Sequence, residues 1–348
     1  MFKVDNAATY FAALNTGQGF VSYFRQIFDP CETVYVIKGG SGTGKSRFMR
    51  EVSNAAKSKG YSVEEFLCSS DPSSLDGILI KEKSLAVLDG TAPHIHEPTL
   101  IGARERFIDL SVFLDCEQLK LKRDEIASLS ASKARRYQQI YEYLYVISSL
   151  DRSVNKLVLN SFEKDKMEKA VKKSVLYVQK SDIYEKKIRI RSSIGTEGSI
   201  TLNSYSLKAK KRFAICDLCG LGGIYLKLLL EASDKIGASV EVSYSPFAPD
   251  LPDALYYPDT CTAFYIGIEG EPNEDIINMR RFAIDEKLRP YKPEIRSLNK
   301  LKNSVIERML YDFASVKRLH FALEEIYSAA MDFKAKEEFT KAFIRERI

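Results

Sequence analysis

Hydrophobic and polar positions follow a strand–loop–helix order that occurs twice along the chain. An apolar, β-branched run at 33–37 precedes a glycine-rich loop, and apolar residues between 48 and 56 then recur at three- and four-residue spacing, which predicts an amphipathic helix. A second such run at 213–216 leads into another glycine-rich stretch and a long apolar helix pattern. Further short apolar runs predict strands at 63–68 and 85–88. This order is typical of an α/β fold.

The two halves also share sequence. GYSVE at 60–64 recurs as GASVE at 237–241, and DPSSLDGI at 71–78 matches APDLPDAL at 248–255 in outline. NTGQGF (15–20) and GTEGSI (195–200) stand at the same distance before their strands. We interpret the chain as two copies of one module, about 177–179 residues apart. The alternative is a chance resemblance between two glycine-rich α/β units.

Two segments carry helical patterns. Residues 117–180 contain no Pro or Gly and suit a helical hairpin, and apolar positions between 305 and 330 predict a core-facing helix in which His320 is expected to be structural. We therefore divide the chain into a first module (1–115), a basic helical insertion (116–190), a second module (191–290) and a C-terminal helical segment (291–348).

Composition excludes several classes of protein. The 348 residues are 45% hydrophobic and 28% charged, without an apolar run near the roughly 18 residues that a membrane span needs. The first twenty residues carry no signal-type apolar stretch, and the six cysteines are scattered. We therefore expect a cytoplasmic protein without a membrane span or a disulfide framework.

The net charge of +5 is unevenly distributed. Residues 116–215 contain 22 Lys and Arg against 11 Asp and Glu, a net charge of +11, so the remainder carries −6. Such a segment could face phosphates, nucleic acid or an acidic partner, and Tyr137, Tyr141, Tyr143 and Tyr145 could stack on bases. Because acids are interspersed and the tyrosines have helical spacing, a solvated helix with packing tyrosines is favoured. Nucleic acid stays a possible but not a favoured partner.

The loop after the first strand carries a phosphate-binding motif. TVYVIKGGSGTGKS (33–46) matches G-x-x-x-x-G-K-[ST] in the strand–loop–helix context that this motif requires. Backbone N–H groups of such a loop surround phosphates, Lys45 would reach the β- and γ-phosphates, and the Ser46 hydroxyl would ligate Mg²⁺. The sequence therefore predicts an ATP site built from Gly39, Gly40, Ser41, Gly42, Thr43, Gly44, Lys45, Ser46 and Arg47.

Acidic residues for catalysis follow two neighbouring strands. Asp89 ends the apolar run of SLAVLDGT (84–91) and is expected to be the second Mg²⁺ ligand, although Asp-Gly is also an ordinary turn pair. Residues 69–77 read as a polar loop with Asp71 and Asp76. Either Asp71 or His94 could position an attacking water or a phosphoacceptor, and either could be a turn residue instead. Lys45, Asp89, Asp71 and His94 are thus the catalytic candidates.

The second glycine-rich stretch, CDLCGLGGIY (216–225), lacks these chemical groups. Aligned by sequence, Ile224 replaces Lys45, Tyr225 replaces Ser46, and Asp89 falls over Gly267 or its neighbours. We expect a degenerate module that binds no nucleotide and is kept for packing or regulation. A single Cys216-x-x-Cys219 pair gives too few ligands for a metal site. Arg189 and Arg191, where the chain enters this module, are candidates to reach across to the first site.

The chain resembles a poorly characterised bacterial family of P-loop ATPases with two tandem modules. The resemblance rests on NTGQGFVSYF (15–24), KGGSGTGKS (38–46), CSSDPSSLDG (68–77), LDGTAPH (88–94) and LHFALEEIYSAAMDF (319–333), and it covers nearly the whole chain. It implies ATP binding at Lys45 and Ser46, hydrolysis and a cytoplasmic site of action. The second loop looks intact in some relatives, and this chain departs from them there.

Three functions follow as expectations. The first is a Mg²⁺-dependent ATPase with one active site and one degenerate site. The second is a small-molecule or nucleotide kinase whose phosphoacceptor lies near 68–77 and His94. The third is a nucleotide-responsive protein that binds ATP, acts on an unknown protein partner and has negligible turnover.

Overall fold

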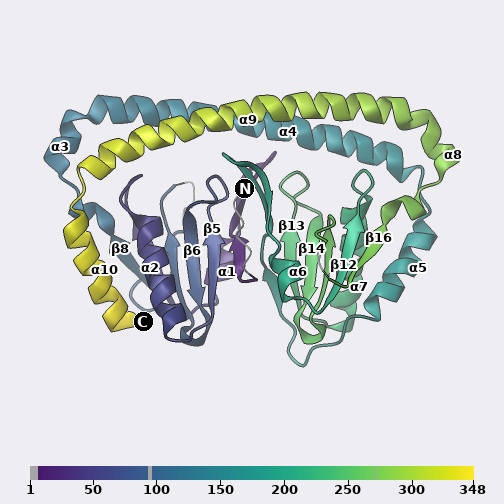
Figure 1. Cartoon of the computed structure of the whole chain (residues 1–348), viewed down its shortest axis with the longest axis horizontal. Helices are drawn as coiled ribbons and strands as arrows, with labels where there is room; N and C mark the ends of the chain where they lie inside the picture. The colour runs from purple at the N-terminus through teal and green to yellow at the C-terminus, as the bar shows by residue number, and fades with distance from the viewer. Residues whose placement is uncertain (1–6, 93–95, 271) are drawn as a thin grey trace.

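The computed structural model describes residues 7–92, 96–270 and 272–348, which form two similar halves. Each half contains a six-stranded mixed sheet, and the two sheets stand side by side beneath a pair of long helices (Figure 1). The expected α/β class and the internal duplication are therefore confirmed.

The first sheet has the strand order β1-β5-β6-β7-β4-β8, in which β6 is antiparallel to both neighbours and the other pairs are parallel. A hairpin, β2–β3, precedes the short helix α1, and α2 follows β4. The strands are β1 (Thr9–Phe11), β2 (Ala13–Thr16), β3 (Gly19–Ser22), β4 (Thr33–Lys38), β5 (Val63–Leu67), β6 (Leu75–Ile80), β7 (Leu85–Asp89) and β8 (Glu105–Asp109), and the helices are α1 (Phe24–Phe28) and α2 (Lys45–Ser58).

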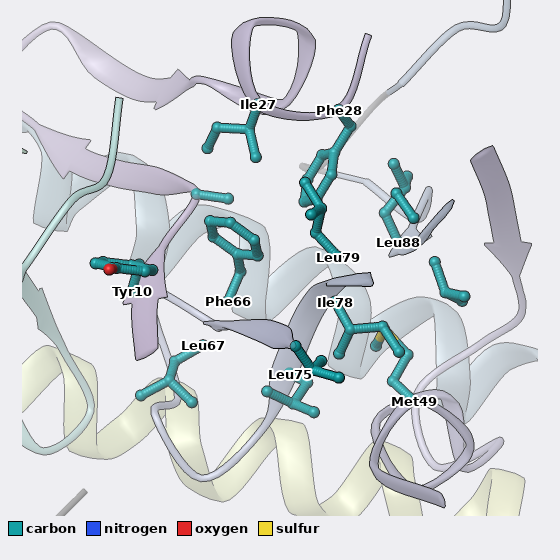
Figure 2. Close-up of a cluster of buried hydrophobic side chains, with 14 of the residues drawn as sticks. Tyr10, Ile27, Phe28, Met49, Phe66, Leu67, Leu75, Ile78, Leu79 and Leu88 are labelled. Carbon is teal, nitrogen blue, oxygen red and sulfur yellow. The ribbon is translucent and has the colours of Figure 1, made fainter. Parts of the chain in front are cut away.

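Strand β6 corrects the expectation of a polar loop through residue 77. All six residues of β6 are buried, Asp76 among them. The apolar side chains of 78–80 pack in the core with those of α1. Gly77 lets the strand approach that helix, since a Cβ at this position would lie 2.7 Å from the Phe28 ring. Figure 2 shows side chains from β5, β6, α1 and α2 converging in this core.

The second half repeats the first, element by element. Its sheet has the order β16-β12-β15-β14-β13-β9, and left-handed glycines recur at matching turns, as at Gly19 and Gly198. Strand β9 joins this sheet, although its residues fall in the predicted helical insertion. The elements are β9 (Lys186–Ile188), β10 (Ser192–Gly195), β11 (Gly198–Thr201), α6 (Ser204–Lys208), β12 (Lys211–Cys216), α7 (Leu221–Ile236), β13 (Val240–Tyr244), β14 (Pro252–Tyr257), β15 (Thr262–Ile266) and β16 (Glu274–Asn278).

The helices that follow each sheet cross to the opposite half. After α3 (Cys116–Leu121), helix α4 (Arg123–Leu159) runs over both sheets, and α5 (Lys164–Val175) packs against α7 of the second half (Figure 1). After α8 (Asp285–Leu288), helix α9 (Lys292–Ala329) returns antiparallel to α4, and α10 (Phe333–Arg347) packs against α2. The predicted hairpin within 117–180 is wrong, because the long partner of α4 is α9.

The halves are joined along the β1 and β9 edges of their sheets. The Phe11 amide donates to the Ile190 carbonyl at 2.8 Å, and the buried Arg189 guanidinium pairs with Glu64 of the first half at 2.7 Å. Tyr137, Tyr141 and Tyr143 pack against the cluster formed by α4 and α9, as the packing interpretation expects, whereas Tyr145 is 55% exposed. Within the described ranges, no helix is both long and apolar enough to cross a membrane.

Candidate functional site

We call residues 39–44, between β4 and α2, the first loop. Gly42 (φ 71°) and Gly44 (φ 77°) have left-handed backbones that side chains adopt at a cost, which explains the glycines. Helix α2 begins at Lys45, whose Nζ donates to the carbonyls of Gly39 (3.1 Å) and Gly40 (2.8 Å). The loop thus folds back on the lysine at a helix N-terminus, where the backbone dipoles favour an anion.

Asp89 lies beside this lysine, at the end of the strand next to β4. The register pairs Ile37 with Asp89, which places a carboxylate oxygen 3.7 Å from Lys45 Nζ. The other oxygen accepts a 2.8 Å hydrogen bond from the Thr91 amide, and the Thr91 hydroxyl donates to the Gly39 carbonyl at 3.1 Å. Thr91 therefore ties the acidic strand end to the first loop, a role that its sequence position did not reveal.

Ser46 completes a set of oxygen ligands suited to Mg²⁺. Its hydroxyl accepts a hydrogen bond from the Leu75 amide at 2.9 Å, and a hydroxyl oxygen has a second lone pair to offer. Among the described residues, no three His, Cys, Asp or Glu side chains gather into a metal-binding group. One carboxylate and one hydroxyl still fit Mg²⁺, because this ion keeps several waters and takes further oxygens from a bound phosphate.

The other predicted site residues have different surroundings. The Asp71 carboxylate accepts hydrogen bonds from the Ser73 amide (3.2 Å) and hydroxyl (2.7 Å), so it closes its own turn. Arg47 points to solvent and pairs with Glu51. Burial and the neighbouring Asp76 raise the pKa of the Cys68 thiol well above its usual range. His94 lies outside the described residues.

Helix α9 packs directly on the first loop. A Cβ at Gly42 would lie 2.7 Å from the Glu324 carbonyl oxygen, and one at Gly40 would lie 3.0 Å from the Tyr327 ring. Although α9 begins in the second half, its C-terminal part therefore covers the loop of the first. Sequence reasoning did not find this contact, because nothing local to the loop indicates which distant helix lies over it.

A polar chain connects this cover with α4. Lys133 Nζ lies 3.1 Å from His320 Nδ1, and His320 Nε2 lies 3.3 Å from a Glu324 carboxylate oxygen. Burial lowers the pKa of Lys133; the nearby Glu324 opposes this shift and Lys45 adds to it. Lys133 thus lies close enough to Lys45 for their charges to interact, on a segment for which the sequence favoured a solvated helix and left phosphates as an alternative.

The second loop, residues 217–220, is shorter than the first. Four residues separate β12 from α7, whereas six separate β4 from α2, and left-handed glycines at 220 and 44 precede the two helices. Leu221 therefore corresponds to Lys45, and Gly222 to Ser46. The predicted pairing with Ile224 and Tyr225 is wrong by three residues, because sequence alignment did not detect the shortening.

A carboxylate of the chain itself occupies the second loop. Asp217 accepts hydrogen bonds from the amides of Gly220 (2.9 Å) and Gly222 (2.5 Å), the groups that would surround a phosphate in an intact loop. Ile266 stands at the position of Asp89, since it pairs with Ile215 as Asp89 pairs with Ile37. Cys216 and Cys219 are free thiols.

The two arginines where the chain enters the second module have separate partners. Arg189 does reach the first half, but it pairs with Glu64 rather than entering the candidate site. Arg191 stays in the second half, where it pairs with Glu269 at 2.8 Å and donates to the Ile266 carbonyl at 3.0 Å. Neither guanidinium therefore approaches the first loop.

No protein-family model, curated protein or solved structure matches the chain.

Proposed function

We propose that the chain binds ATP with Mg²⁺ at the first loop and hydrolyses it, as a P-loop ATPase with one working site and one degenerate counterpart. The observation that carries the proposal is the 3.7 Å approach of Lys45 to Asp89, across adjacent parallel strands and at a helix N-terminus. A phosphate-binding lysine and a metal-binding acid need this arrangement.

In this proposal, Lys45 turns from the loop carbonyls to the phosphates, and its ammonium neutralises their charge. Ser46 and Asp89 would hold Mg²⁺, which when bound supplies further positive charge to the phosphate oxygens. Lys133 adds a cation from α4. Because phosphoryl transfer is catalysed chiefly by positioning and electrostatic stabilisation, these groups account for the site without a dedicated base.

The surroundings of residues 68–77 favour hydrolysis over the kinase alternative. A phosphoacceptor would need an open polar group there, and the Asp71 carboxylate is engaged in its own turn while β6 continues the sheet. The resemblance to tandem P-loop ATPases supports the same choice.

The test is ATP turnover and ATP binding in the presence of Mg²⁺, measured for the wild type and Lys45→Ala. We expect one ATP per chain for the wild type, and loss of both binding and turnover in the variant. Lys59→Ala is the matched control, because this exposed lysine lies just beyond the far end of α2. Wild-type turnover in Lys45→Ala would refute the site, and ATP binding without any turnover would favour the nucleotide-responsive alternative.

A further inference from the structure

The C-terminal segment contacts the first loop at three of its glycines. Two of these contacts come from α9, and the third, at Gly44, comes from α10. There, the Nζ of Lys336 lies 3.4 Å from the point that a Cβ on Gly44 would occupy, and its Cε lies 3.5 Å from the same point. Gly44 is the residue that precedes the first turn of α2. A charged side chain of α10 therefore lies where the proposed phosphate-binding helix begins.

Lys336 is buried, and its charge has no partner. The residue is 2% exposed, and within the part of the chain that the structure describes its Nζ makes neither a hydrogen bond nor an ion pair. Glu51 on α2 is close enough to interact with this charge, but its carboxylate pairs with Arg47 at 2.9 Å. Burial lowers the pKa of Lys336, which is the direction expected for an ammonium that lacks an acceptor.

Aromatic packing fixes the position of Lys336. About one and two turns further along α10, Phe339 and Phe343 pack on Phe48 of α2, with ring centroids 6.1 and 5.2 Å apart. The Phe343 ring also meets Tyr35 of β4 edge-on at 4.9 Å. The apolar core, and not an ion pair, therefore holds this lysine beside the loop.

The start of α2 offers donors that complement this ammonium. The first amides of a helix have no acceptor within the helix, and Gly44 has no side chain with which to cap them. Such amides favour an anion, and a lysine beside them adds to the positive potential. Burying an ammonium without an acceptor costs free energy, and an oxygen of a bound phosphate would offset that cost. The surroundings of Lys336 therefore suit an anionic ligand at this end of the loop.

We propose that Lys336 is a nucleotide-binding residue, whose ammonium pairs with the phosphate chain of ATP bound at the first loop. The inference rests on the proposed function, because it assigns a further contact to that same site. It makes α10 a part of the site, so that the C-terminal segment supplies a charge to the ligand in addition to covering the loop. Lys45 and Lys336 then approach the phosphates from two helices that are far apart in sequence. A lysine with a role only in the fold would have no effect on ligand affinity.

The test is calorimetric titration of the full chain with ATP and with inorganic tripolyphosphate, both in the presence of Mg²⁺, for the wild type and Lys336→Met. Methionine keeps the approximate length of the side chain and removes its charge. We expect binding of both ligands to weaken by about 10- to 100-fold, the range for the loss of one charge-assisted hydrogen bond. Lys334→Met is the matched control, because this exposed lysine lies on the same helix, and it should bind both ligands as the wild type does.

Urea unfolding without ligand separates binding from folding. Lys336→Met should be at least as stable as the wild type, because it removes a buried ammonium that has no acceptor. Lys336→Gln, which is also neutral, replaces it if the methionine variant does not fold. The proposal is overturned if a folded neutral variant binds ATP as the wild type does, or if ATP binding weakens while tripolyphosphate binding is unchanged. Wild-type ATP affinity in Lys336→Met together with its loss in Lys45→Ala would refute this inference alone, whereas a wild type that binds no ATP would refute the proposed function as well.

Discussion

The Asp217 carboxylate gives the sharpest test of why the second loop should bind no phosphate. We consider Asp217→Ala in a Lys45→Ala background, so that phosphate binding at the first loop does not contribute. The variant removes the group that accepts hydrogen bonds from the amides of Gly220 and Gly222 at 2.9 and 2.5 Å. Asp217→Asn is the matched variant, since it keeps the size and one acceptor oxygen and removes only the charge.

The magnitude follows from the role of these bonds at the start of α7, a 16-residue helix. Losing a side-chain cap costs about 0.5–2 kcal/mol, and losing a negative charge near a helix N-terminus costs about 0.3–1 kcal/mol. We therefore expect Asp217→Ala to lower the free energy of unfolding by about 1–3 kcal/mol. Asp217→Asn should lose less, because its oxygen can still accept one amide.

Urea unfolding followed by circular dichroism and tyrosine fluorescence measures this loss, since the chain has 19 Tyr and no Trp. Inorganic phosphate then tests whether the amides have become an anion site. At ten times the dissociation constant, phosphate should restore about 1.4 kcal/mol to Asp217→Ala and nothing to its Lys45→Ala parent. Equal stability of parent and variant, or an equal response to phosphate, would refute the carboxylate's role as an internal occupant of the loop.

Three other outcomes are expected. Asp89→Asn should raise the Mg²⁺ concentration needed for ATP turnover while some ATP binding persists; identical Mg²⁺ titrations would exclude it as the metal acid. Arg189→Met should lower the free energy of unfolding by about 1.5–3 kcal/mol in urea titrations, because Glu64 loses its buried inter-half partner and keeps only Lys81 at 2.9 Å, and adding Glu64→Gln should recover part of that loss. Lys133→Met should lower ATP turnover and raise the free energy of unfolding. Because burial lowers the pKa of Lys133, the folded wild type binds fewer protons than the unfolded chain, and its stability therefore increases with pH. The amount by which the wild type is less stable than Lys133→Met should thus shrink as pH rises toward about 10.4. A deficit independent of pH would contradict that assignment.

The first loop was predictable because its determinants are local. A strand, a glycine-rich turn, a lysine and a helix are contiguous in sequence, and the order of elements places Asp89 on the neighbouring parallel strand. The duplication was predictable for the same reason, since turn glycines such as Gly60 and Gly237 need left-handed backbones in both copies.

Features that depend on distant contacts were not predictable. Strand β6 was not predicted because Asp76 and Gly77, near its start, are residues typical of turns. The apolar run that follows them is a strand because it packs on α1. Helix α4 packs against α9, and the apolar periodicity of 117–180 does not indicate which distant helix that partner is. The second loop is two residues shorter than the first, but the glycine spacing remained similar enough for Ile224 to align with Lys45 in the sequence. The structure instead aligns Lys45 with Leu221, because these residues begin α2 and α7.

The crossed helices bear on how the two halves could act together. Helix α9 contacts the first loop at Gly42, and through Asn299 and Lys302 it lines a cavity of about 1110 Å³ beside the second loop. Helix α4 lines the same cavity, and its Lys133 contacts His320 of α9. A Cβ at Gly42 would lie 2.7 Å from the Glu324 carbonyl oxygen, so the backbone of the loop is in close contact with α9 at this residue. ATP bound at the first loop would therefore act on a pair of packed helices that also contact the second half. Because binding linkage is reciprocal, any ligand of the second half that changes ATP affinity by some factor must have its own affinity changed by ATP by the same factor. If the first loop binds ATP as we propose, the shared helices give the second half a physical route to affect it without binding a phosphate of its own.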